Sequence, residues 1–264
     1  MKILFIGVGH MAGSLIKGIT KSTSNKKYEI YINNRESTVA KAQELNVKPL
    51  VNLEDLQNEG IEVIVLGVRP AQLKEIAIVL DQFNLTNVTI VSMLSGISAD
   101  KITEAFGRHP KLKIVRIMPN INADITKSVT GICANHYGEK SIDEVFDIFS
   151  NCGSVEKINE DIFSEFTISG GCTPAYILFF LKAFVDAAVK SGLEYQTALR
   201  TIIGSFEGTI ANLKKSSKTP EAIIGEICVP NGVTIEGIKV FENSNLEKIV
   251  FEAFNKALKK DKEH

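Results

Sequence analysis

The sequence has no tryptophan, and its four cysteines, Cys133, Cys152, Cys172 and Cys228, lie far apart without forming a CxxC pair. That spacing excludes a zinc ribbon or a disulfide framework, so we expect reduced and mostly buried thiols. The chain also lacks HExxH and GxSxG motifs and any carboxylate cluster with metal-ligand spacing. Metal chemistry and nucleophilic-serine chemistry are therefore not predicted.

Neither sign of charge is in excess, because 30 Lys and Arg residues oppose 31 Asp and Glu residues. A nucleic acid or an anionic membrane surface is therefore not an expected partner. The apolar run KILFI near the N-terminus is too short for a signal sequence or a membrane span. We expect a soluble, cytoplasmic protein. The tail ALKKDKEH is expected to be a solvated charge run without a function.

The 264 residues are enough for two domains. Short β-branched runs alternate with amphipathic or turn-rich sequence through the first half, namely KILFI, YEIYI, EVIVLGV, TIVSML, KIVRIM and TGICA. This rhythm predicts a mostly parallel sheet with crossover helices. The strand-like runs stop near Asp161, so we predict a first domain over residues 1–158 and a second over 159–264.

The second domain is predicted to be all-helical. A long apolar helix is expected from near Pro174 to Gly192, followed by helices at roughly 195–214, 219–228, 234–242 and 245–260. The segment ILFFLKAFVDAAVKSG is apolar on most of its faces, and such a helix must be buried. A subunit interface would bury it, so we expect a homo-oligomer, either a dimer or an assembly of dimers.

A GxGxxAG motif lies between the first predicted strand and the first predicted helix, with Gly7, Gly9 and Ala12-Gly13 at its fixed positions. In a dinucleotide-binding unit the first glycine permits a tight turn, the second lets the diphosphate approach, and the small third residue lets helix and strand pack closely. The helix N-terminus favours the negative charge. The alternative is a glycine turn that binds nothing, which this strand and helix context disfavours.

The motif therefore predicts an α/β fold with an N-terminal Rossmann-type dinucleotide-binding domain. The all-helical C-terminal domain that follows is expected to be a dimerisation domain, because its long apolar helix needs a subunit interface. We expect cofactor contacts along the whole turn, at Gly7, Val8, Gly9, His10, Met11 and Ala12.

The end of the second predicted strand indicates which cofactor is bound. An acidic residue there holds the ribose hydroxyls of NAD, whereas this chain has Asn33-Asn34-Arg35-Glu36. Neutral amides and an arginine suit a 2′-phosphate, so we predict NADPH, bound through Asn34 and Arg35. Glu36 beside Arg35 leaves NADH as the alternative, and an ordinary surface arginine is the other interpretation of Arg35.

At this point the chain resembles the pyrroline-5-carboxylate reductases, which reduce a cyclic imine to proline in the last step of proline biosynthesis. The resemblance spans almost the whole chain and rests on six blocks in order, FIGVGHMAG (5–13), LGVRPAQL (66–73), SMLSGIS (92–98), RIMPNINA (116–123), SGGCTPAYI (169–177) and VPNGVTIEGI (229–238).

The resemblance implies further cofactor contacts, at Asn52, Val68, Arg69, Pro70, Leu94, Ser95 and Gly96. The last six follow predicted strands at the carboxyl edge of the sheet, where ligands of doubly wound folds bind. Gly96 would let the backbone lie close to the nicotinamide.

The resemblance implies substrate contacts at Asn120, Pro174, Gly232, Val233 and Thr234, with Thr234 as the catalytic hydroxyl near the ring nitrogen. Unpaired N–H groups of the turn before Thr234 can hold a carboxylate. Two plainer interpretations remain, because Asn120 suits a structural turn and Thr234 suits a helix N-cap.

Some positions depart from the family pattern. The chain has Ile121-Asn122 where the family's block has Thr-Pro, and it has Cys172-Thr173 where the family has Ser-Gly. Other departures are Asn231 and Val233 in the later turn, and Ser217 near a position where a glutamate is common. They surround the predicted substrate pocket, so two alternatives stay open. One is a reductase of another small imine or of a carbonyl, and the other is a regulatory protein that has lost turnover.

No histidine is predicted to be catalytic. His10 lies in the phosphate-binding turn, while His109, His136 and His264 lie in loop or tail sequence. This agrees with a hydride transfer, in which the cofactor carries the chemistry and needs little acid and base assistance.

Overall fold

The computed structural model describes residues 1–22, 27–35 and 37–263, so Glu36 and His264 lie outside the described residues. Contacts divide the chain into two compact units, one of Met1–Pro174 with Leu258–His264 and one of Ala175–Ala257. The last strand ends at Lys157, next to the predicted boundary, but the first helices after it stay in the first unit.

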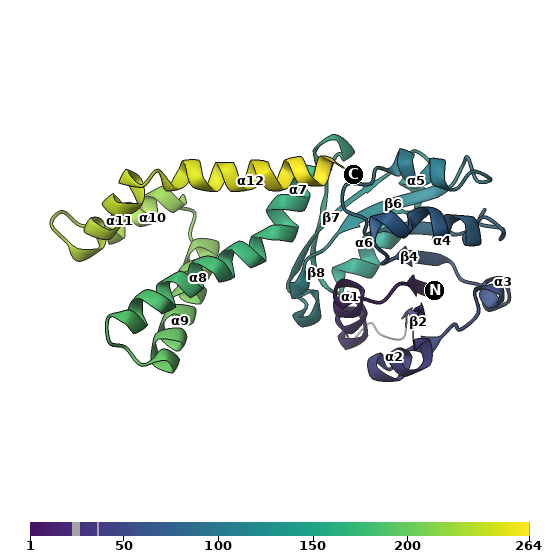
Figure 1. The fold of residues 1–264 in the computed structure, drawn as a ribbon, viewed down its shortest axis with the longest axis horizontal. Helices are drawn as coiled ribbons and strands as arrows, with labels where there is room; N and C mark the ends of the chain where they lie inside the picture. The colour runs from purple at the N-terminus through teal and green to yellow at the C-terminus, as the bar shows by residue number, and fades with distance from the viewer. Residues whose placement is uncertain (23–26, 36, 264) are drawn as a thin grey trace. The chain divides into compact units, whose positions relative to one another are not determined.

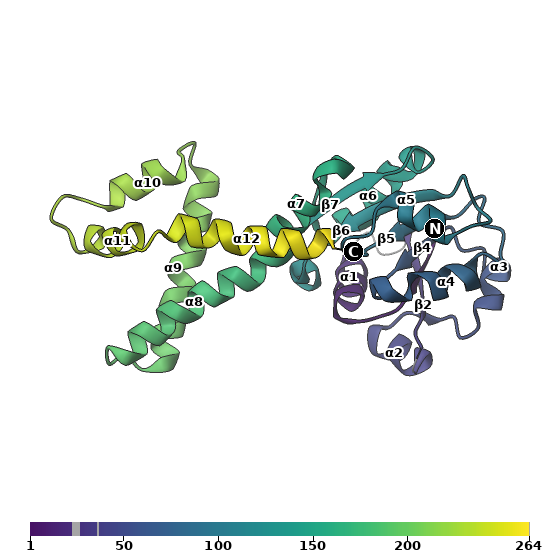
Figure 2. The same cartoon turned by 45° about the horizontal axis from the view of Figure 1, so that its top comes forward.

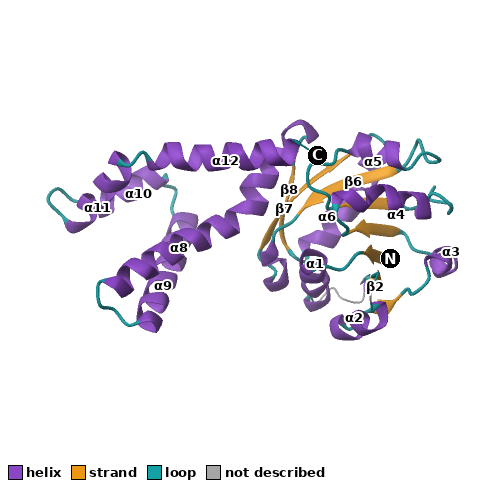
Figure 3. Cartoon of the chain, viewed as in Figure 1, coloured by secondary structure: helices purple, strands orange, loops and turns teal. Residues whose placement is uncertain are grey.

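The first unit is built on one eight-stranded sheet in the order β3-β2-β1-β4-β5-β6-β7-β8 (Figures 1 and 3). The strands are β1 (Lys2–Ile6), β2 (Glu29–Asn33), β3 (Lys48–Pro49), β4 (Val63–Leu66), β5 (Thr89–Ser92), β6 (Lys113–Met118), β7 (Ser128–Ala134) and β8 (Gly153–Lys157). Neighbours pair in parallel except β6 and β7, which are antiparallel. The predicted α/β class and the mostly parallel sheet are confirmed.

Helices cover both faces of this sheet. They are α1 (His10–Lys21), α2 (Thr38–Leu45), α3 (Leu56–Glu59), α4 (Leu73–Leu80), α5 (Ala99–Ala105), α6 (Ile142–Ser150) and α7 (Phe163–Phe166). Alternate strand residues point to opposite faces, so that Ile3 and Phe5 pack with α1, α2 and α6 while Leu4 and Ile6 pack with α3, α4 and α5. Strands buried on both faces explain the continuous apolar runs in the sequence.

Short 3₁₀ segments complete the unit, at η2 (Leu53–Asp55), η3 (Pro70–Gln72), η4 (Ile121–Ile125), η5 (Glu139–Ser141) and η6 (Glu160–Ile162).

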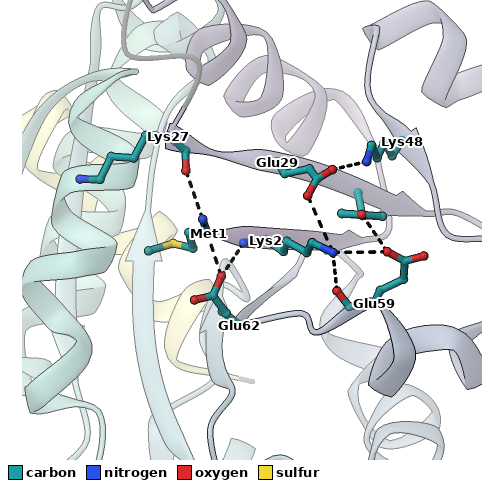
Figure 4. A network of polar contacts seen from close by, with 8 residues as sticks. Met1, Lys2, Lys27, Glu29, Lys48, Glu59 and Glu62 are labelled. Carbon is teal, nitrogen blue, oxygen red and sulfur yellow. Dashed lines mark hydrogen bonds and ion pairs between the residues drawn. The ribbon is translucent and has the colours of Figure 1, made fainter.

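The amino edge of the sheet is held by a polar network (Figure 4). Lys2 donates its Nζ hydrogen to the backbone oxygen of Glu59 at 2.7 Å, and its backbone N–H to the Glu62 carboxylate, also at 2.7 Å. Glu29 pairs with Lys48, which lowers the pKa of the Glu29 carboxyl. Charges are thus paired at this edge, whereas the turns at the opposite, carboxyl edge carry the predicted ligand residues.

Two of the four thiols lie in the core of the first unit. Cys133 and Cys152 are buried, and burial raises the pKa of each thiol to about 12. Cys172 and Cys228 are half-buried, and within the described chain none of the four forms a disulfide. The structure therefore agrees with four reduced thiols.

A buried arginine joins three elements of the first unit. Arg116 in β6 is 5% exposed and its Nη1 lies 3.0 Å from Glu160 Oε1. The guanidinium also lies 4.3 Å from the ring centroid of Phe163, and Glu160 accepts a hydrogen bond from the backbone N–H of Ala99. This contact ties the segment after β8 to the sheet and to the start of α5.

A π-helical segment, η7 (Thr167–Cys172), joins α7 to α8 (Thr173–Lys190). Pro174 has no N–H, so the carbonyl of Gly170, four residues earlier, cannot receive the usual helical hydrogen bond. Asn120 Nδ2 donates to that carbonyl at 3.0 Å. The proline thus explains the local widening of the helix, and Asn120 satisfies the acceptor that it leaves. The long helix α8 thus begins at Thr173, beside Pro174 as predicted, and the unpredicted segment η7 precedes it.

The prediction of a solvated tail is wrong at Asp261, whereas the other charged tail residues that the structure describes are exposed as predicted. The last helix, α12 (Leu246–Lys262), ends in the first unit, and Asp261 is only 6% exposed. Lys262 Nζ lies 2.7 Å from Glu165 Oε1 in α7, which lowers the pKa of the Glu165 carboxyl. Part of the charge-rich tail is thus packed against the first unit rather than solvated.

The second unit contains helices only, as predicted. Besides most of α8 and α12 it holds α9 (Tyr195–Lys215), α10 (Pro220–Ile227) and α11 (Val233–Asn243), and Figure 2 shows them from a second direction. Gly192, with φ of 104°, follows α8 and ends it close to the predicted position. Phe184 of α8 contacts Phe206 and Phe241 edge to face, at centroid distances of 6.2 and 6.3 Å.

This unit has little core of its own. Within Ala175–Ala257, all of which the structure describes, the buried hydrophobic residues are Val185, Ala198 and Ile223. Leu178 and Phe179 of α8 are 63% and 74% exposed. By length and composition the helical stretch Glu160–Lys190 could also cross a membrane, and 6% of its most apolar window is buried. The apolar face of α8 therefore needs a partner.

Arg116→Ala is expected to lower the free energy of unfolding by about 2 to 3 kcal/mol, because it leaves a partly buried Glu160 without its cation. Urea denaturation measures the change. Lys157→Ala is the control, since Lys157 and Asp143 form an exposed pair worth less than about 1 kcal/mol. Equal effects of the two substitutions would contradict the role given to Arg116.

Candidate functional site

Three strand ends meet at the carboxyl edge of the sheet. β1 lies between β2 and β4, so the turns after these strands are neighbours. Gly7 donates its backbone N–H to Asn33 at 2.9 Å, and Gly67 donates to Ile6 at 2.8 Å. The sheet thus brings residues 7–10, 33–35 and 67–69 together, as the strand pattern predicts.

Glycines set how closely these turns approach. Gly7 has φ of 82°, a conformation that other residues adopt only with strain. A Cβ on Gly67 would lie 2.2 Å from the carbonyl oxygen of Gly7, so only glycine fits there. A Cβ on Gly9, by contrast, would meet nothing within 4 Å. Gly9 therefore leaves open space beside the backbone at the start of α1.

This open space lies at the N-terminus of α1, where the sequence predicts that the diphosphate binds. Gly9 is the N-cap of α1 and forms no side-chain cap, so the first N–H groups of the helix are available to an anion. Ala12 is 1% exposed, and its Cβ would lie 3.2 Å from a Cβ on Gly67. The small residue at position 12 thus allows the helix to pack closely against the sheet, as the motif predicts.

The turn after β2 is tied to the glycine turn. Asn34 Oδ1 accepts a hydrogen bond from the backbone N–H of Val8 at 3.1 Å, and the backbone N–H of Asn34 donates to Thr38 Oγ1 at 3.0 Å. Arg35 follows directly. The predicted influence of Glu36 on cofactor choice lies outside the described residues.

A cavity of about 520 Å³ occupies this edge. Its lining includes eight of the predicted cofactor residues, Gly7, Val8, Gly9, His10, Asn34, Arg35, Val68 and Arg69. The other predicted cofactor residues, Met11, Ala12, Asn52, Pro70, Leu94, Ser95 and Gly96, are not in that lining. Asn52 is exposed after β3, and Leu94 to Gly96 follow β5, one strand further along the sheet.

Six residues of this lining were not among the predicted cofactor contacts, namely Ile6, Asn33, Gly67, Gln72, Glu75 and Ile76. Gln72 Oε1 accepts the backbone N–H of Arg69 at 3.0 Å and so orients the turn after β4. A glutamine three residues after the N-cap Arg69, followed by an apolar helical pattern, is the signal that could have indicated this contact.

A second hollow, of about 490 Å³, shares Val8, Gly9 and His10 with the first. Its cations have partners, because Lys41 lies 2.8 Å from Glu44 and Lys17 lies 3.9 Å from Asp124. Arg35 and Arg69 line the first cavity instead, which makes that cavity the better site for a phosphorylated cofactor.

The turn predicted to hold the substrate lies between α10 and α11 in the second unit. Asn231 has φ of 62°, and Gly232 donates its N–H to Val229 at 3.0 Å. Gly232 is the N-cap of α11, so the interpretation of Thr234 as an N-cap is wrong. Val233 and Thr234 are exposed in the first turn of that helix. Their role in substrate binding stays a prediction.

The other two predicted substrate residues, Asn120 and Pro174, have a structural role in the first unit. Asn120 is 5% exposed, and its Oδ1 accepts the backbone N–H of Asn122 while its Nδ2 donates to Gly170. Their contact with substrate also stays a prediction.

The fold and the glycine-lined edge define a dinucleotide-dependent oxidoreductase with a separate helical domain. Two family models match the chain. Residues 2–96 match the model described as NADP oxidoreductase, coenzyme F420-dependent, and residues 160–264 match that of pyrroline-5-carboxylate reductase dimerisation. The first unit therefore contains an NADP-binding domain, and the helical part is a dimerisation domain.

Full-length relatives are also known. Pyrroline-5-carboxylate reductase 2 of Bacillus subtilis is 30% identical, over 99% of this chain and 94% of its own length. The crystal structure of 1-pyrroline-5-carboxylate reductase from Streptococcus pyogenes matches with a TM-score of 0.90 and 32% identity, covering 100% of this chain and 99% of that one. The chain belongs to the pyrroline-5-carboxylate reductase family.

A solved Plasmodium falciparum pyrroline carboxylate reductase with NADP bound has the same fold, with a TM-score of 0.89 at 24% identity, covering 99% of this chain and 97% of that one.

Gly9→Ala is expected to leave thermal stability unchanged but to weaken NADPH binding about tenfold or more, because the methyl group enters the open space for the diphosphate. Gly67→Ala is expected to lower both the thermal stability and the affinity for NADPH, since its Cβ would collide with the Gly7 carbonyl. Thermal unfolding and NADPH fluorescence titration measure the two effects.

Gly208→Ala in α9 is the matched control, because nothing lies within 4 Å of its Cβ position and alanine favours a helix. Unchanged NADPH affinity in Gly9→Ala would show that the diphosphate binds elsewhere.

Proposed function

We propose that this chain reduces 1-pyrroline-5-carboxylate to proline with NADPH. One observation carries the proposal, the similarity at 30% identity to a pyrroline-5-carboxylate reductase over nearly the full length of both chains. The carboxyl edge of the sheet supports it, because Gly9 and the start of α1 leave room for a diphosphate.

The cofactor, when bound, supplies the hydride. Backbone N–H groups at the start of α1 would hold its diphosphate, and the guanidinium of Arg35, which lines the cavity, would pair with the 2′-phosphate. Arg69 lies in the same lining and adds positive charge beside the ribose and phosphate groups. These contacts favour NADPH, and NADH lacks the group that Arg35 would bind.

The turn from Pro230 to Thr234 holds the carboxylate of the imino acid, through the N–H groups that the first turn of α11 leaves unpaired. The hydroxyl of Thr234 hydrogen-bonds near the ring nitrogen. The bound cofactor would supply a hydride to the carbon of the C=N bond, and the nitrogen would gain its proton from water or through Thr234. Rate comes mainly from orientation and from exclusion of water, so an acid and base pair is not needed.

The apolar face of α8 is buried against a second copy of the chain, since the helical domain matches the family's dimerisation model. The assembly is a homodimer or is built from homodimers. Reduced thiols and a cytoplasmic location are consistent with an NADPH-dependent biosynthetic enzyme.

Thr234→Val is expected to lower turnover of pyrroline-5-carboxylate about tenfold or more, because valine keeps the shape but removes the hydroxyl hydrogen bond. Thr234→Ser is the matched control and is expected to retain activity. NADPH oxidation at 340 nm with racemic substrate measures both.

No turnover by the wild-type protein, with NADPH still bound, would instead favour another imine or a regulatory role. Turnover that survives in Thr234→Val would remove the catalytic role of the hydroxyl while leaving the reaction in place.

Arg35→Ala is expected to raise KM for NADPH about tenfold, with little change in KM for NADH, because one charge-assisted contact to the 2′-phosphate is lost. Lys41→Ala is the control, since Lys41 already pairs with Glu44. A parallel loss for both cofactors in Arg35→Ala would mean that Arg35 does not read the 2′-phosphate.

A further inference from the structure

The end of the last helix contacts the turn that follows β5. Ser95 lies in this turn, and its hydroxyl donates a hydrogen bond to Oδ1 of Asp261 in the last turn of α12. The two residues are 166 positions apart in the chain but belong to the same compact unit. The contact therefore brings the C-terminus to the carboxyl edge of the sheet.

Asp261 is an unfavourable residue at this position. It is 6% exposed, and among the described residues its Oδ2 is buried without a hydrogen-bond partner. A negative charge in the last turn of a helix also opposes the helix dipole, which favours the neighbouring Lys259, Lys260 and Lys262. Burying a half-satisfied carboxylate destabilises a fold, so stability does not explain why an aspartate lies here.

The hydrogen bond fixes the direction of the Ser95 hydroxyl. A hydroxyl has one hydrogen to donate and two lone pairs that accept, whereas an ionised carboxylate only accepts. Ser95 must therefore give its hydrogen to Asp261 and can only accept from any further partner. The next residue, Gly96, has a φ of 71°, a conformation that favours glycine.

The position of this turn indicates which ligand group would meet it. β5 is next to β4 on the side away from β2, whose end carries Arg35. A dinucleotide whose adenosine phosphate binds at Arg35 and whose diphosphate binds at Gly9 extends along this edge toward β5. Its nicotinamide end carries a carboxamide, which offers N–H donors.

We propose that Asp261 is a positioning residue, which orients the Ser95 hydroxyl to accept an N–H of the nicotinamide carboxamide. The proposal rests on the cofactor assigned under the proposed function. It does not depend on the imine substrate.

The test measures binding by calorimetry on the full-length protein, with three probes. They are NADP, its acetylpyridine analogue, in which a methyl group replaces the carboxamide nitrogen, and the adenosine bisphosphate half, which keeps the 2′-phosphate but has no nicotinamide. The variants are Ser95→Ala, Asp261→Ala and the double substitution. Lys260→Ala is the matched control, because Lys260 lies in the same turn and pairs with the exposed Glu263.

Wild type and Lys260→Ala are expected to bind NADP about tenfold more tightly than the acetylpyridine analogue, the effect of one hydrogen bond. Ser95→Ala is expected to lose this preference for NADP, and Asp261→Ala is expected to lose part of it. The double substitution is expected to bind like Ser95→Ala, because Asp261 acts through the Ser95 hydroxyl. Affinity for the adenosine half stays unchanged in all of them.

Two results would overturn the proposal. One is an unchanged preference for the carboxamide in Ser95→Ala and Asp261→Ala. The other is equal weakening of all three probes, which marks a purely structural contact. Failure of the proposed function gives a different pattern. A wild-type protein that binds none of the probes contradicts the cofactor assignment. A wild-type protein that binds them but does not reduce the imine contradicts only the substrate assignment.

Discussion

The close approach of β1 and β4 at their carboxyl ends is the constraint on which the site depends. A Cβ on Gly67 would lie 2.2 Å from the Gly7 carbonyl, so the two turns can meet only without side chains. This approach lets α1 start directly beside the sheet, with Ala12 packed under it and Gly9 open above it. The proposed anion site would thus result from backbone packing, and the charged residues around the cavity would select the ligand rather than create the site.

Sequence periodicity predicted the architecture well, because the central strands are buried on both faces and leave unbroken apolar runs such as KILFI and KIVRIM. β3 and β8 were not predicted, since they are short or exposed and therefore show no apolar signal. The helices of the second unit were placed to within a few residues, because Pro, Gly and amphipathic spacing mark their ends.

Residues that line the cavity were predicted where they belong to a local sequence motif, and contacts that depend on packing between distant segments were not predicted. Gly7, Gly9 and Arg35 are readable from a motif and a strand end. The burial of Asp261 is not readable, because it depends on where a helix that begins at Leu246 ends in space. The same limit applies to Asn120. Its side chain donates a hydrogen bond to the carbonyl of Gly170, because Pro174 has no N–H to donate to that carbonyl.

The central claim is that the carboxyl edge of the sheet holds NADPH for direct hydride transfer to an imine carbon. Incubation of the protein with pyrroline-5-carboxylate and NADPH carrying deuterium at the transferred position tests it most directly, with mass spectrometry of the product. The account predicts proline that contains one deuterium atom. Proline without deuterium, or bound cofactor with no proline formed, would contradict it.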